Sequence, residues 1–183
     1  LVRIDGMKKM INDLLDLTRI ESGEKKRKLE NCDIINSVNR AIDTLEPSAR
    51  EKDISINLEA PQEVYMECDD SEIQIIMNNL LSNAIKYNKE NGRVDVVIEN
   101  HKDSVDISVA DTGIGMSEEE QEKLFEEFTR IKNKKTKGIE GSGLGLSILQ
   151  KIVNLYNGSI SVESEPDKGT KFGIKLYKQA IKD

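Results

Sequence analysis

The chain has 183 residues and a formal net charge of −7, and 33% of its residues are charged. A single domain takes on the order of 100 to 200 residues, so this length predicts one main hydrophobic core. Acidic and basic residues are interspersed along the sequence, which excludes a surface built to neutralise the phosphates of a nucleic acid.

No apolar run approaches the ~20 residues of a membrane-spanning helix, and the sequence shows no secretory signal. The two cysteines, Cys32 and Cys68, have neither a CxxC spacing nor a nearby histidine. This favours free thiols in a reducing compartment over a disulfide or a metal site. We therefore expect a cytoplasmic chain.

Apolar residues recur with a helical period from residue 1 to about residue 22, which predicts a long N-terminal helix with a stripe as wide as those of bundle helices. The stripe consists of Ile4, Met7, Met10, Ile11, Leu14, Leu15 and Leu17. The charged run 24–28 that follows is expected to be a solvated connection.

A second helix is expected over residues 34–45, with Asp33 as its N-cap and Pro47 at its end or at a kink. Two short alternating segments, 54–58 and 64–68, predict a pair of strands. The remaining elements are a helix from Asp70 or Ser71 to about Tyr87, strands over 94–99 and 104–110, a helix over 117–128 capped by Ser117, a helix over 144–156, and strands over 159–163 and 170–176. This order predicts an α+β fold, a mixed sheet covered by helices on one face.

Four polar side chains share one face of the expected helix 70–87, because Asn79, Asn83, Lys86 and Tyr87 recur at helical spacing. Amide oxygens suit a hard cation and a lysine suits a phosphate, so the pattern fits a nucleotide bound with Mg²⁺. It fits a polar, solvent-facing helix surface equally well.

Two glycine-containing segments follow. Asp111 stands at the end of an expected strand, where its carboxylate can accept a hydrogen bond from an amino group such as that of adenine, and Gly113 and Gly115 permit close approach to a flat ring; an ordinary tight turn is the alternative. Segment 141–146, GSGLGL, exposes backbone N–H groups at the start of a helix, as anion-binding loops do, or forms a flexible hinge.

Taken in order, these segments resemble the conserved boxes of sensor histidine kinases, members of the GHKL superfamily. NNLLSNAIKY resembles the N box, DTGIGM the first glycine box, LFEEFTR the F box and GSGLGLSI the second glycine box, while LLDLTRIESG resembles the second helix of the dimerisation and phosphotransfer hairpin. The resemblance implies a Bergerat-type two-layer α/β sandwich preceded by a long N-terminal helix. Residues 1–28 would be part of the hairpin with its linker, and residues 29–183 the catalytic ATP-binding domain.

The resemblance also implies roles for individual residues, with ATP and Mg²⁺ as the bound groups. Asn83 would coordinate Mg²⁺ held by ATP, and Phe125 and Phe128 would anchor the ATP lid, residues 132–142. The positions implied for phosphate binding are Asn79, Lys86, Arg130, Gly141, Gly143, Leu144 and Gly145. Those implied for nucleotide binding are Asn83, Tyr87, Asp111, Gly113, Gly115 and Leu146.

In this family the γ-phosphoryl group of ATP passes to a histidine on the first hairpin helix of a homodimer and then to an aspartate of a response-regulator receiver domain. The one histidine of this chain, His101, stands in an expected turn, so we predict ATP binding without self-phosphorylation. The ATP domain would swing on the connection 23–28 to reach the acceptor. The resemblance leaves open whether the full-length protein is anchored to the inner membrane.

Two alternatives remain at this stage. A GHKL ATPase needs a glutamate close to the N-box asparagine, and Glu72 precedes Asn83 by about three helical turns. A regulatory or scaffold module would bind ATP without kinase activity, although every box of the family is present.

Overall fold

The structure is a computed structural model that describes residues 26–129 and 141–178, together with positions 11, 13–15, 18, 131, 133, 135–137 and 139. The long N-terminal helix expected over residues 1–22 lies largely outside these residues, and its described positions are helical. Among the described helices, none has both the length and the apolar character needed to cross a membrane.

The main sheet has five strands in the order β2-β4-β5-β7-β6. Their bounds are Ser55–Glu59 for β2, Arg93–Asn100 for β4, Ser104–Asp111 for β5, Gly169–Tyr177 for β7 and Ser159–Glu165 for β6. β2 and β4 are parallel and the other neighbours are antiparallel, so the predicted mixed sheet is confirmed.

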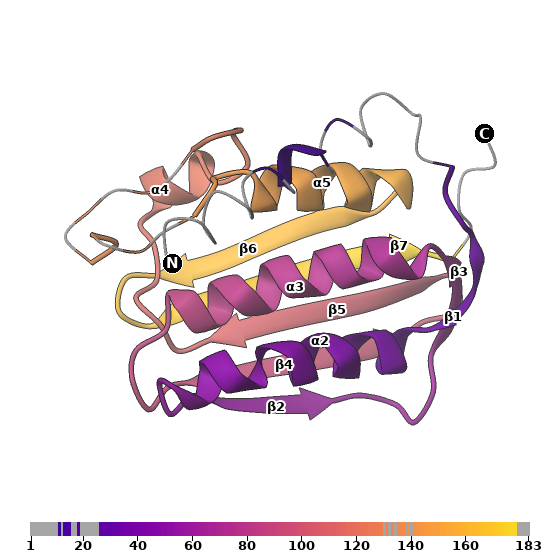
Figure 1. The fold of residues 1–183 in the computed structure, drawn as a ribbon, viewed down its shortest axis with the longest axis horizontal. Coiled ribbons are helices and arrows are strands. Elements are labelled where there is room, and N and C mark those ends of the chain that lie inside the picture. Colours follow the sequence, from indigo (N-terminus) through magenta and orange to yellow (C-terminus); the bar gives the residue numbers. More distant parts are fainter. Residues whose placement is uncertain are drawn as a thin grey trace.

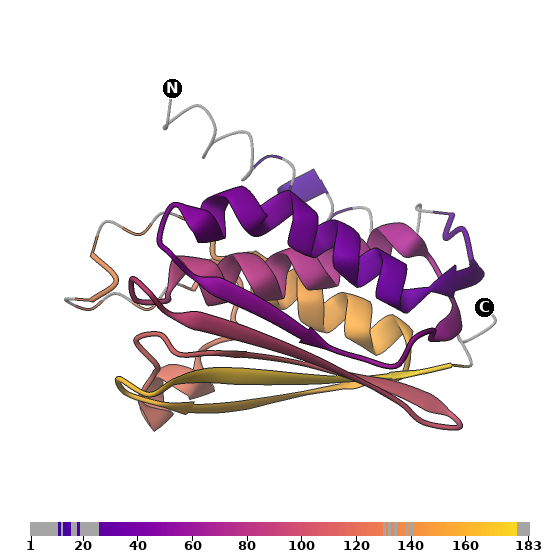
Figure 2. The same ribbon diagram turned by 90° about the horizontal axis from the view of Figure 1, so that it is seen from below.

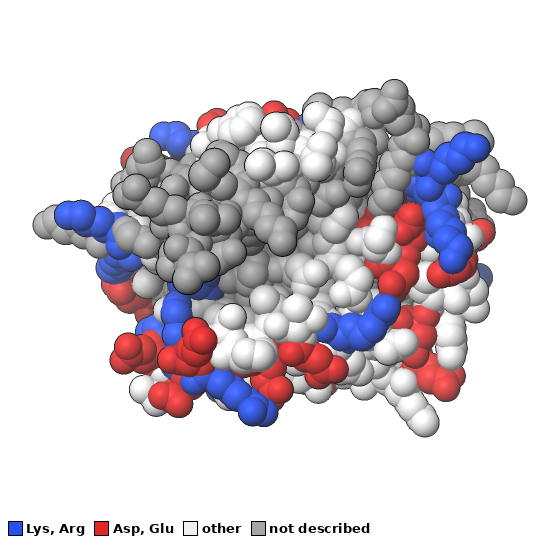
Figure 3. Space-filling model, viewed as in Figure 1, with Lys and Arg blue, Asp and Glu red and all other residues white. Residues whose placement is uncertain are grey.

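Three helices cover one face of this sheet: α2 (Ile34–Arg50), α3 (Asp70–Lys86) and α5 (Gly145–Leu155). Figure 2 shows the helices in one layer and the sheet in the other, as the two-layer prediction requires. Acidic and basic side chains lie next to one another along the lower edge and the right side of the face drawn in Figure 3, in keeping with the interspersed charges of the sequence.

The core forms where the alternating strands meet the apolar helix stripes. Every second residue of β4 and β5 is buried, and these side chains pack against the buried face of α3. The buried side chains at this contact are Val94, Val96, Ile98, Val105, Ile107 and Val109 of the strands and Ile73, Ile76, Met77, Leu80 and Leu81 of the helix. Because this apolar stripe packs on the sheet, the rotation of α3 about its axis is fixed, and so is the direction of its polar side chains.

Helix starts were predicted well, and helix ends less well. The Asp33 carboxylate caps α2 by accepting a 3.0 Å bond from the N–H of Ile35. Pro47 does not end this helix, since Glu51 still donates to the Pro47 carbonyl at 3.1 Å. The helix expected over 117–128 is shorter: α4 (Glu118–Glu122) begins with the capping box of Ser117 and Glu120 and ends well before Phe128, whose φ of 59° is left-handed.

The predicted pairing of segments 54–58 and 64–68 is wrong. β2 joins the main sheet, whereas β3 (Tyr65–Cys68) pairs antiparallel with β1 (Glu30–Asp33) in a separate two-stranded sheet. The strand β1 was not predicted, because its sequence, ENCD, is short, polar and without alternation. The strands that pair with β2 and β3 are β4 and β1, which are distant from them in the sequence, so the assumption that neighbouring strands pair is wrong here.

Candidate functional site

A pocket is lined by the end of β5, the C-terminal half of α3 and the start of α5. These ends of the three elements lie on the left in Figure 1. The pocket gathers residues from segments that are far apart in the sequence. Of the predicted site residues, the pocket lining includes Asn79, Asn83, Lys86, Tyr87, Asp111, Gly115, Gly141, Gly143, Gly145 and Leu146.

The amide of Asn79 is oriented within its own helix. Its Nδ2 donates to the carbonyl of Ile75 at 2.9 Å, which turns the side-chain oxygen toward the start of α5. A Cβ added to Gly145 would lie 2.4 Å from that oxygen, so a larger residue at position 145 would displace the Asn79 amide. One face of α3 and the first turn of α5 therefore meet at the pocket.

Lys86 brings a positive charge to the same pocket. Its Nζ would lie 2.6 Å from a Cβ at Gly141, and it sits 4.8 Å from the centroid of the Tyr87 ring. The ammonium group thus stands between the glycine segment and the end of α3, where it can bind an anion together with the backbone of the glycine segment.

Asp111, the last residue of β5, also lines the pocket. Its Oδ1 accepts a 2.8 Å hydrogen bond from the N–H of Gly113. Burial raises the pKa of Asp111, and the backbone N–H groups of Gly113 and Thr170 offset the rise only in part. The remaining acceptor capacity of this partly buried carboxyl group is available to a donor inside the pocket.

Tight approaches on both sides hold the loop after Asp111 in place. A Cβ at Gly113 would lie 2.3 Å from the Tyr87 carbonyl, and one at Gly115, whose φ is +61°, would lie 1.9 Å from the Glu165 carbonyl. Ile114 donates to the same Tyr87 carbonyl at 3.1 Å. Gly113 thus shapes the loop from outside the pocket lining, while Gly115 also lines it.

At the start of α5, Oγ of Ser142 accepts a 3.2 Å hydrogen bond from the N–H of Leu144. Leu144 occupies the N-cap position, makes no side-chain cap bond and is fully buried, outside the lining. Gly143 has a φ of +76° and passes close to the backbone of Phe128, where a Cβ would lie 2.9 Å from the Phe128 carbonyl carbon. Gly141, Gly143 and Gly145 line the pocket at this helix start, and the first N–H groups of a helix have no acceptor within the helix itself.

The remaining predicted residues do not line the pocket or are not described. Phe125 packs against the core, and Phe128 is 59% exposed. Arg130 lies outside the described residues.

Several lining residues were not singled out from the sequence: Asp13, Ile114, Met116, Leu124, Thr129, Ile131, Thr170 and Phe172. Three more, Asn133, Thr136 and Ser142, belong to segment 132–142, which was predicted only as a whole, as the lid. Ile114 and Met116 belong to the segment after Asp111 and could have been included on that ground. Phe172 reaches the site through the register of β7, which places it opposite Val109 of β5. No sequence signal identifies that register.

A family model for histidine kinase-, DNA gyrase B- and HSP90-like ATPases matches residues 68–180. The chain is 35% identical over 173 residues to the sensor histidine kinase RppB of Synechocystis sp., covering 93% of this chain and 38% of RppB. It resembles the catalytic domain of the histidine kinase ThkA with a TM-score of 0.73 at 27% identity, covering 82% of this chain and 96% of that one. The full-length histidine kinase ShkA, solved in complex with AMPPNP, matches with a TM-score of 0.81 at 26% identity, covering 96% of this chain and 37% of ShkA.

The chain belongs to the family of histidine kinase-, DNA gyrase B- and HSP90-like ATPases. Within it, the relatives and structures named above are histidine kinases, and the chain corresponds to their ATP-binding catalytic domain. The predicted resemblance and the α+β two-layer fold are therefore confirmed, whereas the long N-terminal helix stays a prediction. ATP is the ligand class of the family. The chain spans less than half the length of the curated sensor kinases that it matches first.

Proposed function

We propose that this pocket binds ATP together with Mg²⁺ and presents the γ-phosphoryl group to a histidine on a helical hairpin. The observation that carries the proposal is the meeting of three groups in one pocket: the amides and lysine of α3, the carboxyl group of Asp111, and the glycine-rich start of α5. The amides and lysine of α3 suit a phosphate chain with its metal ion, and the carboxyl group of Asp111 suits a base that carries an amino group. The glycine-rich start of α5 suits phosphate oxygens.

The adenine would lie at the Asp111 end. Asp111 accepts a hydrogen bond from the exocyclic amino group, and apolar side chains on either side, including Ile114, Met116 and Phe172, provide surfaces for a flat ring. Thr170 and Leu146 complete this end of the lining. A carboxylate among these apolar side chains selects a base with a donor at that position.

The phosphates would lie toward α5. Backbone N–H groups of residues 141–145 and the ammonium group of Lys86 bind phosphate oxygens, while the side-chain oxygen of Asn83 coordinates Mg²⁺, with Asn79 beside it. Arg130 approaches the terminal phosphate in this proposal. In phosphoryl transfer the protein contributes mainly positioning and charge neutralisation. The amides, the lysine and the backbone N–H groups of this lining can provide both without a covalent intermediate on the pocket.

We propose further that residues 1–28 are part of the dimerisation hairpin with its linker and that residues 29–183 are the catalytic domain. Ile11, Leu14 and Leu15 are large apolar side chains exposed at described helical positions. Such a stripe suits packing in a bundle with the first hairpin helix and a second subunit. The acceptor histidine would then pass the phosphoryl group to the receiver domain of a response regulator.

The ATPase alternative requires a carboxylate that activates water near the γ-phosphate. Glu72 is buried at the far end of α3, where Arg27 and Tyr156 bind its carboxylate. The carboxyl groups among the described lining residues are those of Asp13 and Asp111, and the second lies at the proposed adenine end. Asp13 comes from the N-terminal segment, and its carboxylate accepts the hydrogen bond of the Ser142 hydroxyl. The relatives named above are histidine kinases, which favours transfer to a separate acceptor over hydrolysis.

Incubation of the chain with Mg²⁺ and γ-labelled ATP tests this proposal. We expect saturable binding, no acid-labile label on the chain and no steady release of inorganic phosphate. His101 stands at the opposite end of β5 from Asp111, on the order of 20 Å away by strand geometry, so it is out of reach of the pocket. Label on His101, or phosphate release at a constant rate, would contradict the proposal.

A further inference from the structure

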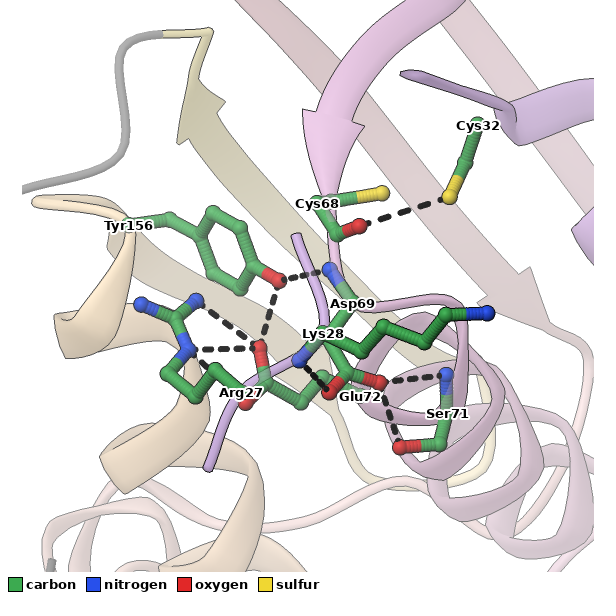
Figure 4. Close-up of polar contacts among 8 residues, drawn as sticks. All are labelled: Arg27, Lys28, Cys32, Cys68, Asp69, Ser71, Glu72 and Tyr156. Atoms are coloured by element: carbon green, nitrogen blue, oxygen red, sulfur yellow. Dashed lines mark hydrogen bonds and ion pairs between the residues drawn. The ribbon is translucent and has the colours of Figure 1, made fainter. Parts of the chain in front are cut away.

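The N-terminal end of α3 carries a buried carboxylate far from the pocket. Glu72 lies in the first turn of the helix, and its side chain is 1% exposed. Figure 4 shows that side chains from two other parts of the chain converge on it: Arg27, from the connection before β1, and Tyr156, at the C-terminal end of α5.

Arg27 binds Glu72 through two parallel hydrogen bonds. Its Nε donates to Oε1 at 2.9 Å and its Nη2 donates to Oε2 at 2.8 Å. The guanidinium group also stacks over the Tyr156 ring, 4.8 Å from its centroid. Burial alone would lower the pKa of Arg27, but the bonds to Glu72 outweigh it and raise the pKa, so the arginine stays charged.

Tyr156 and Asp69 extend this contact into the backbone. The Tyr156 hydroxyl donates to Oε2 of Glu72 at 2.5 Å and accepts a 3.0 Å bond from the N–H of Asp69. Asp69 in turn accepts a 3.0 Å bond from the N–H of Lys28, the residue after Arg27. The connection is thus held by a side chain and by its own backbone at successive residues.

This arrangement cannot open without a penalty. Withdrawal of Arg27 would leave the carboxylate of Glu72 buried without its counter-charge, and a buried charge that loses its partner is strongly destabilising. The ion pair of Arg40 and Asp70, one residue from Asp69, differs in this respect because both side chains are substantially exposed.

We propose that Arg27, Glu72 and Tyr156 form a clasp that fastens the connection to the catalytic domain, so that the domain pivots N-terminal to Arg27. The connection expected over 23–28 is then shortened at its C-terminal side, because Arg27 and Lys28 move with the domain. The clasp also ties α3 to α5 at the ends remote from the pocket, which their other ends line. The pivot rests on the proposed function, whereas the clasp does not.

Limited proteolysis with trypsin, in the absence of nucleotide, tests the clasp. Trypsin needs the arginine side chain in its own pocket, so cleavage after Arg27 reports opening of the clasp, and mass spectrometry identifies the new N-terminus at Lys28. We expect slow cleavage there in the wild type. Glu72→Gln and Tyr156→Phe should each accelerate this cleavage by about tenfold or more. The first removes the negative charge that pairs with Arg27, and the second removes the hydroxyl that donates to Glu72.

Asp70→Asn is the matched control, because it removes the exposed ion pair with Arg40 on the same helical turn and should leave the cleavage rate after Arg27 unchanged. If Glu72→Gln fails to fold, Tyr156→Phe and amide exchange at Lys28 in the wild type replace it, with slow exchange expected. Wild-type cleavage after Arg27 as fast as in the denatured chain would overturn the proposal, as would fast exchange at Lys28 or a rate insensitive to Tyr156→Phe. Loss of ATP binding would not affect any of these results.

Discussion

Ser142 donates a 2.5 Å hydrogen bond to Oδ2 of Asp13, a residue 129 positions earlier in the chain. Both residues line the pocket, next to Gly141 and Gly143. The contact therefore brings a negative charge from the N-terminal segment to the end of the pocket that we assign to the phosphates. A carboxylate and a phosphate repel each other there, so the contact and the bound nucleotide oppose one another.

Asp13→Asn should strengthen nucleotide binding, because it removes the charge and keeps an oxygen that can accept from Ser142. A partly solvated charge pair is worth about 0.5 to 1 kcal/mol, which predicts a two- to fivefold lower Kd at low salt and a smaller effect at high salt. Isothermal titration calorimetry measures this. Asp43→Asn, an exposed change on α2, is the control and should have no effect. An unchanged or weaker affinity in Asp13→Asn contradicts the assignment of the phosphate end.

Asn83→Ala should weaken nucleotide binding by about tenfold or more when Mg²⁺ is present and by much less in EDTA, because the lost oxygen is a metal ligand in our proposal. Asn78→Ala is a matched control on the same helix. Its side chain is absent from the pocket lining, and its Oδ1 is buried without a partner among the described residues. Equal losses in the two variants, or a loss in Asn83→Ala that ignores Mg²⁺, would count against Asn83 as the ligand.

Asp111 should make nucleotide binding sensitive to pH. Burial raises its pKa, so Asp111 takes up a proton at a pH where exposed aspartates, with pKa values of ~3.9, stay ionised. An amino group binds the ionised form better, so affinity should fall as the pH drops through the raised pKa, and binding should release protons there. Calorimetry in two buffers of different ionisation enthalpy measures both. Asp111→Asn should lose this profile, and a wild-type affinity independent of acidic pH would refute the prediction.

The same shift has a consequence for folding without nucleotide. A carboxyl group whose pKa is higher in the folded chain than in the unfolded chain favours folding at low pH. That contribution is lost as the pH rises from the ordinary aspartate value through the raised pKa of Asp111. Denaturant titrations of the wild type and Asp111→Asn at several acidic pH values should therefore show that the free energy of unfolding of the wild type, relative to the variant, falls as the pH rises through this range.

Tyr156→Phe should lower the free energy of unfolding by about 1 to 3 kcal/mol at neutral pH, because Glu72 and the N–H of Asp69 each lose a buried partner. Burial, followed by the bond to Glu72, raises the pKa of Tyr156. The unfolded chain ionises this tyrosine above pH ~10 while the folded chain does not, so the wild-type advantage should shrink as the pH rises further. Urea unfolding checks both parts. Tyr65→Phe, at a 48% exposed position, should show neither effect.

Local patterns predicted the residues that lie on single elements. The helical period of α3 placed Asn79, Asn83 and Lys86 on one face, and the structure brings that face to the pocket. The apolar alternation of β5 likewise predicted that Asp111 ends a strand. In both cases the signal is a period of the backbone itself, which requires no knowledge of distant partners.

What the sequence did not reveal depends on contacts between distant segments. The parallel pairing of β2 with β4, the approach of Asp13 to Ser142 and the bonds of Arg27 to Glu72 all join residues with no common local pattern. Arg27 stands in a charged run that suggests only a solvated connection. Its partial burial follows from the place of Glu72 in the fold, and no period in the sequence encodes that place.

The most direct test of the central claim is a calorimetric titration of the chain with Mg²⁺-ATP and, separately, with Mg²⁺-GTP. We predict one-to-one binding of ATP, and an affinity for GTP lower by about tenfold or more, because guanine presents a carbonyl oxygen where adenine offers its amino group to the Asp111 carboxylate. The absence of saturable heat with ATP, or equal affinities for the two nucleotides, would contradict the account.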